Sequence, residues 1–156
     1  MSNQFTLGEN SRKEVAEGLN HILADTYTLY VKTQNFHWNV EGPRFRALHL
    51  MFEEQYTDLQ GAVDELAERI RALGEYAPGT FSRFGELSSI KEAPSKPPAA
   101  EAMVDQLIAD NVAVGKDIKK VISTAEDAGD TVTADMLTAR LTVHEKSAWM
   151  LRAINK

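Results

Sequence analysis

Apolar residues recur every three or four positions along most of the chain, and this spacing predicts four long helices. The clearest pattern spans residues 43–73, where an apolar stripe continues for about eight helical turns. Shorter stripes with the same period predict three further helices, over residues 11–39, 99–128 and 131–154. The members of the clearest stripe are Phe45, Leu48, Phe52, Tyr56, Leu59, Val63, Leu66, Ile70 and Leu73.

Three stretches of turn-forming residues separate the predicted helices. They are the Gly-Pro pair at residues 42–43, a long region over residues 74–98, and residues 126–130. Helices of about 24–30 residues would each be about 35–45 Å long, which favours a four-helix bundle. The connection over residues 74–98 is long enough to cross the bundle from end to end, and it could hold a short helix near residues 82–87. One long crossover of this kind is the ferritin-like arrangement, so the predicted fold is an all-α, ferritin-like four-helix bundle.

Several residues refine the predicted ends of the first two helices. Asn10 or Ser11 can cap the first helix, and Glu14, three residues after Ser11, would complete a capping box. Pro43 suits the first position of the second helix, and Gly74 suits the position just after its end.

The composition is that of one globular domain with an acidic balance of charge. The chain has 156 residues, of which 43% are hydrophobic and 26% charged, and its formal net charge is −6. We therefore expect a single domain over residues 1–156, with residues 1–10 as a flexible N-terminal segment. A negative net charge does not favour binding to nucleic acid, which usually needs a basic patch. Because the chain has no cysteine, any metal site must use histidine, aspartate and glutamate.

Four potential metal ligands share one face of the predicted second helix. With His49 set at 0° and about 100° per residue, Glu53 lies at about 40°, Asp64 at about 60° and Glu68 at about 100°. The apolar stripe centres at about −60°, so this face would point away from the core. A solvated helix face is the simplest interpretation of the carboxylates alone. The i, i+4 spacing within each of the two pairs, however, places their side chains close enough to share one ion.

A second histidine, His37, lies twelve residues before His49 and on the other side of the turn at residues 42–43. In an antiparallel helix pair, residues equally far from the turn lie side by side, so the two imidazoles can meet. Glu53 and Asp64 are eleven residues apart, or about 16 Å along a helix, which is too far to bind one metal ion. We call His37, His49 and Glu53 the histidine half-site, and Asp64 and Glu68 the carboxylate half-site.

A two-fold dimer can bring the two half-sites together. If the second helix packs antiparallel on its symmetry mate near Asp58 and Leu59, the histidine half-site of each chain faces the carboxylate half-site of the other. Imidazole and carboxylate groups together are a plausible ligand set for iron. A di-iron site inside a single bundle is not expected, because its Glu-x-x-His motif does not occur in the chain.

These spacings closely resemble those of the Dps family of mini-ferritins, the DNA-binding proteins from starved cells. The resemblance rests on residues 35–74, NFHWNVEGPRFRALHLMFEEQYTDLQGAVDELAERIRALG, and on HEKSAWMLRA near the C-terminus. The family has a histidine, a second histidine twelve residues on, an acid four on, an aspartate eleven on and a glutamate four on. The chain departs from this pattern only at Glu53, where aspartate is common. The matching residues are His37, His49, Glu53, Asp64 and Glu68.

The resemblance implies an iron-storage and detoxification protein. It implies a hollow dodecamer with ferroxidase centres at two-fold interfaces, where the two histidines come from one subunit and Asp64 and Glu68 from its neighbour. Members of the family oxidise Fe(II), usually with hydrogen peroxide in preference to dioxygen. They store the ferric mineral inside and so protect DNA from oxidative damage.

The resemblance also suggests roles for residues outside the two half-sites. Trp38 resembles a tryptophan near the family's centre that could absorb stray oxidising equivalents, with packing at the interface as an equal alternative. Acids near the start of the last helix line three-fold pores in the family, so Asp130 and Asp135 are candidates for a pore through which iron enters. Helix-start chemistry is the alternative for these acids. The two other histidines, His21 and His144, are expected to be packing or structural residues.

Direct DNA binding is expected to be weak or absent despite the family name. Some members carry a lysine-rich tail, whereas the first eleven residues here contain no lysine or arginine. Neutralisation of phosphates supplies most non-specific affinity for DNA. Two alternatives stay open: a nucleoid or DNA-binding protein with weak ferroxidase activity, and a structural assembly that holds a non-redox ion such as zinc.

The sequence also predicts where the protein works. The N-terminal residues lack the apolar core of a secretory signal. No apolar run approaches the about 20 residues that span a membrane. We therefore expect a cytoplasmic protein, free or associated with the nucleoid, without membrane contact.

Overall fold

The computed structural model describes residues 7–156, which form four long helices and one short helix. The predicted all-α bundle, with a short helix in its long crossover, is confirmed, and no strand occurs in this part of the chain. The long helices are α1 (Glu9–Asn39), α2 (Phe45–Ala72), α4 (Ala100–Asp127) and α5 (Thr131–Ile154), and the short helix is α3 (Phe81–Leu87).

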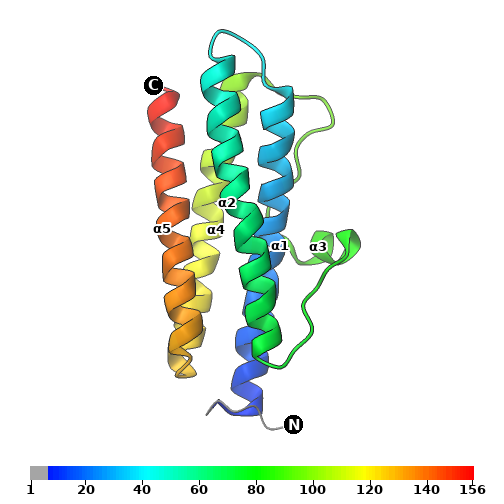
Figure 1. Ribbon diagram of the computed structural model, residues 1–156, viewed down its shortest axis with the longest axis vertical. Coiled ribbons are helices and arrows are strands. Elements are labelled where there is room, and N and C mark those ends of the chain that lie inside the picture. Colours follow the sequence, from blue (N-terminus) through cyan, green and yellow to red (C-terminus); the bar gives the residue numbers. More distant parts are fainter. Residues whose placement is uncertain (1–6) are drawn as a thin grey trace.

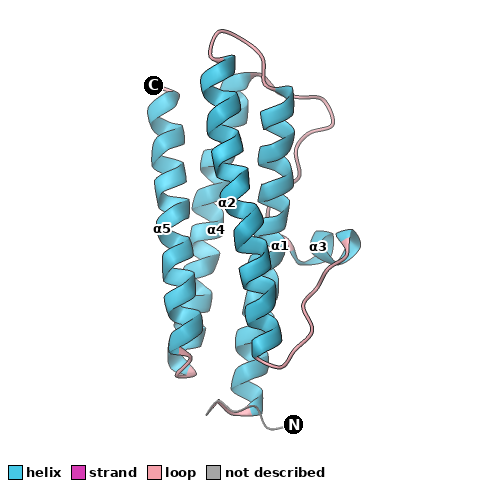
Figure 2. Cartoon of the chain, in the orientation of Figure 1, coloured by secondary structure: helices cyan, strands magenta, loops and turns pink. Residues whose placement is uncertain are grey.

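The long helices form two antiparallel hairpins, α1 with α2 and α4 with α5 (Figure 1). The crossover, residues 73–99, leaves α2 at the end of the bundle where α1 begins and reaches α4 at the opposite end (Figure 2). α3 projects beside α1 along this path. Because the crossover spans the bundle, α2 and α4 run in the same direction, which a simple up-down bundle does not allow.

The start of α1 differs from the prediction. The helix begins at Glu9, and Gly8 occupies its N-cap position without a side-chain hydrogen bond. Ser11 and Glu14 therefore lie inside the helix and do not form the expected capping box. Of the segment predicted to be flexible, residues 1–6 lie outside the described residues, whereas residues 9 and 10 are already helical.

The ends of α2 follow the prediction in part. Pro43 lies before the helix, in a turn that is closed by the hydrogen bond from Phe45 N–H to Gly42 O at 3.0 Å. The expected proline at the first helical position is therefore wrong by two residues. Gly74 follows the C-cap Leu73 with a φ of 96°, a left-handed conformation that glycine adopts without a steric penalty.

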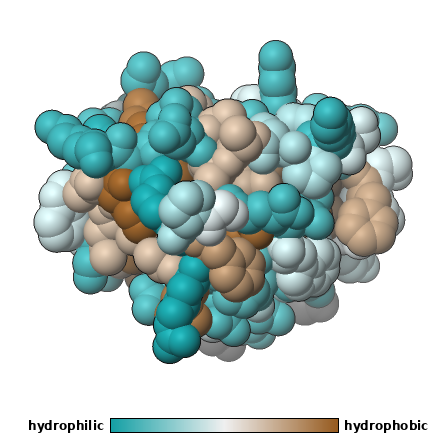
Figure 3. Space-filling view, turned by 90° about the horizontal axis from the view of Figure 1, so that it is seen from above, coloured by the Kyte–Doolittle hydropathy of each residue, from teal (hydrophilic) through white to brown (hydrophobic). Residues whose placement is uncertain are grey.

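The core lies between the four long helices and consists of apolar side chains from each of them. In α2, most of the predicted stripe is buried, but Phe45 at its start is 44% exposed. Full burial of one such side chain typically contributes about 1.5–3 kcal/mol. Seen end-on, the surface is mostly hydrophilic with scattered apolar patches (Figure 3). Within residues 7–156, none of the helices is both long and apolar enough to cross a membrane.

The crossover is attached to α1 by polar and aromatic contacts. Asp25 is buried, and its carboxylate accepts hydrogen bonds from the Ser89 backbone N–H at 2.6 Å and from the Ser88 hydroxyl at 3.2 Å. Burial raises the pKa of the Asp25 carboxyl, and the hydrogen bonds from Ser89 partly offset this rise. Tyr27 of α1 stacks on Phe84 of α3, with ring centroids 4.6 Å apart. These contacts hold α3 against the first hairpin.

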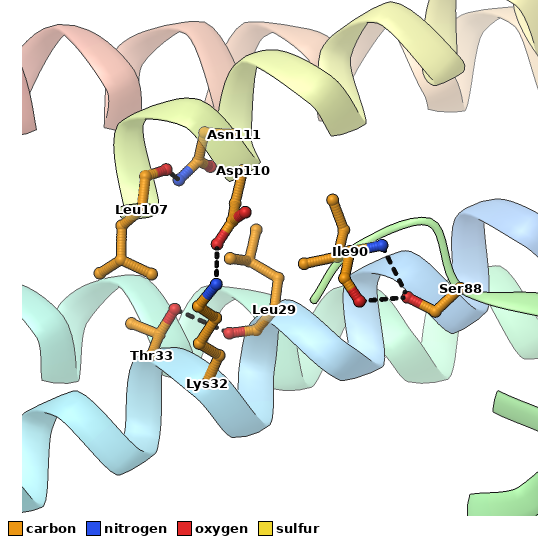
Figure 4. A network of polar contacts seen from close by, with 8 residues as sticks. All are labelled: Leu29, Lys32, Thr33, Ser88, Ile90, Leu107, Asp110 and Asn111. Carbon is orange, nitrogen blue, oxygen red and sulfur yellow. Dashed lines mark hydrogen bonds and ion pairs between the residues drawn. The ribbon is translucent and has the colours of Figure 1, made fainter. Parts of the chain in front are cut away.

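Contacts between α1 and α4 join the hairpins, among them an ion pair and a close approach at a glycine. Figure 4 shows Lys32 of α1 reaching Asp110 of α4, with Nζ and Oδ2 2.8 Å apart. These side chains are only 3% and 14% exposed, so the pair is shielded from water. Nearer the N-terminus of α1, a Cβ atom at Gly18 would come within 2.9 Å of a Val121 methyl group. Glycine at this position therefore allows the two helices to approach closely.

Candidate metal centre

His37 and His49 meet beside the turn that joins α1 to α2, as their spacing predicts. His37 lies in the last turn of α1 and is 7% exposed, and His49 lies near the start of α2. Their imidazole rings stack with centroids 3.8 Å apart and an interplanar angle of 14°. The backbone turn alone therefore brings the two potential nitrogen ligands side by side.

Each imidazole is held by the backbone of the other histidine. His37 Nδ1 lies 2.7 Å from His49 O, and His49 Nδ1 lies 2.7 Å from His37 O. A carbonyl oxygen can only accept, so both Nδ1 atoms must carry the proton and donate it. In its neutral form each ring then presents Nε2 as the atom with a free lone pair, which is the form that binds a metal ion. A backbone carbonyl is a common partner for a metal-binding histidine because it fixes the tautomer and the ring orientation.

Two aromatic side chains of α2 pack against the imidazoles. The Phe45 ring stacks on His49 with centroids 4.9 Å apart, and the Tyr56 ring meets the edge of His37 at 5.2 Å. Both residues belong to the predicted apolar core stripe, and their contact with the imidazoles was not predicted. Phe45 is one turn before His49 and Tyr56 two turns after it, so the same helical spacing could have identified them.

The three carboxylates of the predicted site lie on the outer surface of α2. Glu53, Asp64 and Glu68 are all exposed, and none of them takes part in an ion pair among residues 7–156. Glu53 lies one turn after His49 and can extend the histidine half-site. The carboxylate half-site lies about 16 Å farther along the helix axis. Accordingly, within the described part of one chain, no three histidine or acidic side chains gather closely enough to hold a metal ion.

Trp38 is far more exposed to solvent than the neighbouring His37. Its side chain is 65% exposed, although His37 beside it is buried. It lines a groove of about 410 Å³ where the end of α1 meets the end of the crossover at Lys96 and Pro97. A role for Trp38 near bound iron therefore stays a prediction.

The two acids proposed for an iron pore occupy different environments. Asp130 is 3% exposed and caps α5, since its carboxylate accepts hydrogen bonds from Thr133 N–H at 3.0 Å and from Arg69 Nη2 at 2.8 Å. These contacts favour the helix-start alternative for Asp130. Asp135, in contrast, is exposed on α5 and is free to face a pore. The pore itself stays a prediction.

The remaining two histidines have structural contacts. His21 is exposed, and its Nδ1 lies 3.1 Å from the carbonyl oxygen of Leu87 at the end of α3. His144 is buried, and its Nδ1 lies 2.9 Å from Asn111 Oδ1. His21 thus helps to attach the crossover to α1, while His144 links α5 to α4.

Comparison with known proteins places this architecture in one family. The ferritin-like domain matches residues 16–156. DNA protection during starvation protein 2 of Bacillus anthracis is 43% identical over 141 residues, which are 90% of this chain and 96% of that protein. The DNA protection during starvation protein of Brevibacillus brevis is 45% identical over 139 residues, covering 89% and 93% of the two chains.

Comparison with solved structures points to the same family as these relatives. The crystal structure of a Dps protein from Bacillus brevis has a TM-score of 0.92 and 40% identity, covering 96% of this chain and 100% of that one. The Vibrio cholerae Dps protein, described as a member of the ferritin-like diiron-carboxylate superfamily, has a TM-score of 0.91 and 31% identity, covering 99% and 100%. The sequence, the bundle with one long crossover and these matches all agree. They show that the chain belongs to the Dps family of ferritin-like proteins.

Proposed function

We propose that the protein stores iron and detoxifies it by oxidising Fe(II) at centres shared between two subunits. The observation that carries this proposal is the His37–His49 pair, whose reciprocal backbone hydrogen bonds direct both Nε2 lone pairs away from the protein backbone. A core histidine pair would need no such common tautomer. The exposed carboxylates on the same face of α2 supply the oxygen ligands that iron also accepts.

The two half-sites can be joined only by a second chain. They lie on one side of α2, with Gln60 and Gly61 between them, and both of these residues are exposed. A Cβ atom at Gly61 would have no neighbour within 4 Å, so this part of the helix leaves room for another helix. An antiparallel α2 from a two-fold partner would place its Asp64 and Glu68 beside His37 and His49. Each dimer would then contain two complete centres.

The chemistry follows from the charges and proton positions of these groups. The carboxylates attract Fe(II) as the substrate and favour the more highly charged ferric product. Each Nδ1 proton is already donated to a carbonyl oxygen, which fixes the orientation of the ring and leaves Nε2 as the nitrogen that can bind iron. Two Fe(II) ions give one electron each to hydrogen peroxide, which takes up two protons and becomes two water molecules. A paired transfer of this kind releases no hydroxyl radical.

The resemblance to the family is the basis for what we propose about the assembly and the oxidant. We propose a hollow dodecamer built from two-fold dimers, with ferric mineral stored inside and hydrogen peroxide used in preference to dioxygen. Protection of DNA would follow from the removal of Fe(II) and peroxide. The names of two relatives, which refer to DNA protection during starvation, are consistent with this outcome.

The first test measures oxidation directly. The assembled protein is loaded with Fe(II) without oxygen, hydrogen peroxide is added, and the ferric absorbance is followed in time. We expect His37→Ala with His49→Ala to lose at least about tenfold in the initial rate, because both nitrogen ligands are gone. His21→Ala is the matched control, since it removes an exposed histidine of α1 that belongs to neither half-site. An unchanged rate in the double variant would refute the site.

The second test asks whether one centre uses two chains. A variant that lacks His37 and His49 is refolded together with one that carries Asp64→Asn and Glu68→Gln. In a mixed dimer, one centre has lost all four groups, whereas the other centre keeps them all. Random pairing should therefore restore about a quarter of the wild-type rate, although each variant alone is inactive. If each centre lay within one chain, mixing the two variants would restore no activity. If the site held zinc without redox chemistry, neither the wild type nor the mixture would oxidise Fe(II).

A further inference from the structure

Two buried polar side chains on α5 have no role in the metal centre. Arg140 and His144 are 7% and 2% exposed, and they lie one helical turn apart. Side chains four residues apart on a helix are neighbours, so these two groups face a common region. This region borders α4 through Asn111 and α2 through Asp58.

The hydrogen bonds of His144 determine which of its nitrogen atoms carries the proton. Asn111 Nδ2 donates to Leu107 O at 2.8 Å, so the Asn111 oxygen is the atom that faces His144. That oxygen can only accept, and His144 Nδ1, 2.9 Å away, must donate. Burial and the nearby charge of Arg140 lower the pKa of His144 to about 3, so the ring is neutral at pH 7. His144 Nε2 is therefore a buried acceptor, and none of the residues 7–156 donates to it.

Arg140, in contrast, has buried donors that lack an acceptor among the described residues. Its Nη1 donates to Asp58 Oδ2 at 2.9 Å, and the carboxylate offsets its charge. Its Nε and Nη2 atoms are buried donors for which the described part of the chain supplies no acceptor. Buried polar groups in folded proteins are almost always hydrogen-bonded, so a pair of adjacent groups with complementary needs points to a molecule that satisfies both.

The chemistry of the two groups limits what this molecule can be. It must donate to His144 Nε2 and accept from Arg140. A metal cation could bind the Nε2 lone pair, but it is disfavoured because it cannot accept hydrogen bonds from Arg140 and is repelled by the guanidinium charge. A carboxylate ligand is disfavoured because it has no proton to donate, and Asp58 already balances the guanidinium. A groove of about 330 Å³ between α4 and α5, lined by Asn111 and His144, offers an approach from the surface.

We propose that Arg140 and His144 form a buried site for one small neutral hydroxylic molecule, which is water in the resting protein and is exchangeable for hydrogen peroxide. Both molecules donate and accept hydrogen bonds and differ by one oxygen atom. The exchange matters physiologically only if the proposed function holds, since a protein that consumes peroxide encounters it. The site itself does not depend on iron oxidation, because it shares no residue with the two half-sites.

The test is a crystal structure of the whole metal-free assembly at neutral pH, at a resolution that shows ordered water. We expect a density peak about 2.7–3.2 Å from both His144 Nε2 and an unpaired nitrogen of Arg140. After a soak in hydrogen peroxide, the peak should become elongated. A direct hydrogen bond from Arg140 to His144 Nε2, with no peak between them, would overturn the site. A peak that stays unchanged in peroxide would refute the exchange.

Variants separate this site from the metal centre. His144→Phe removes the acceptor and should abolish the peak, while Thr142→Ala, at an exposed position on the same helix, should keep it. If the phenylalanine variant does not fold, Arg140→Met removes the donors and should have the same effect on the density. The initial rate of Fe(II) oxidation should be unchanged in His144→Phe, because this change leaves both half-sites and the Arg140–Asp58 pair intact. A peak that persists without His144 or without Arg140 would contradict the proposal.

Discussion

Replacement of Asp130 by alanine tests whether this acid serves the fold or an iron pore. Its carboxylate caps α5 through Thr133 and pairs with Arg69, and the two charged side chains are 2% and 13% exposed. Loss of a helix cap typically costs about 1 kcal/mol. Removing one partner of a buried ion pair costs about 3–5 kcal/mol, and the lower end applies because Arg69 keeps its hydrogen bond to the Thr133 hydroxyl.

These two effects together predict that the free energy of unfolding falls by about 4 kcal/mol per subunit. For a chain of this size, 1 kcal/mol shifts the midpoint of thermal unfolding by about 2–4 °C, so we expect a decrease of about 8–16 °C. The measurement is circular dichroism at 222 nm during heating. All samples need the same protein concentration, because assembly stabilises the folded subunit.

Asp135→Ala is the matched control for this experiment. Asp135 is exposed on the same helix, so its loss should change stability by no more than about 0.5 kcal/mol. If it lines a pore, the same variant should slow the uptake of iron into the assembly. A decrease of less than about 1 kcal/mol for Asp130→Ala would refute the structural role of Asp130 as a cap and ion-pair partner.

Three further predictions concern other parts of the molecule. Lys32→Met should lower the free energy of unfolding in urea by about 3 kcal/mol, because it leaves Asp110 buried without its cation, and adding Asp110→Leu should recover most of this loss. The pKa of His144, lowered from 6.5 to about 3, contributes stability that is complete above pH 6.5 and declines as the pH falls towards 3. At pH 5 the loss is about 2 kcal/mol, so the wild type should lose that much more than His144→Gln between pH 7 and pH 5. In a gel shift at neutral pH, the purified protein should bind DNA weakly or not at all, and a salt-sensitive complex at physiological ionic strength would contradict this expectation.

The sequence was sufficient for the parts of the fold that depend on burial. The apolar stripe of α2 predicts the helix because Leu48, Phe52 and Leu66 must face the core, whichever residues stand at the ends. The helix ends depend on weaker and more local interactions. Ser11 and Glu14 matched a capping box, but α1 continues past them to Gly8, where backbone conformation alone starts the helix.

The candidate metal centre shows a similar division. The meeting of His37 and His49 follows from their equal distance to the turn, and the outward direction of Glu53 follows from the helical period. The reciprocal hydrogen bonds could not be predicted from the sequence. They depend on the side-chain rotamers of the two histidines and on how far α2 is shifted along its axis relative to α1. The polar contacts of Arg140 and His144 have no local pattern at all, since their partners come from α2 and α4.

The division of the bundle into two hairpins also has a consequence for the order of folding. Contacts are densest within α1–α2 and within α4–α5, whose members are joined by short turns, and they are sparse between α2 and α5. Contacts between residues close in sequence form with little loss of chain entropy, so each hairpin can form early. The Lys32–Asp110 pair and the attachment of the crossover at Asp25 join distant segments and would come later. Since His37 and His49 both belong to the first hairpin, we expect their imidazoles to be paired before the bundle closes.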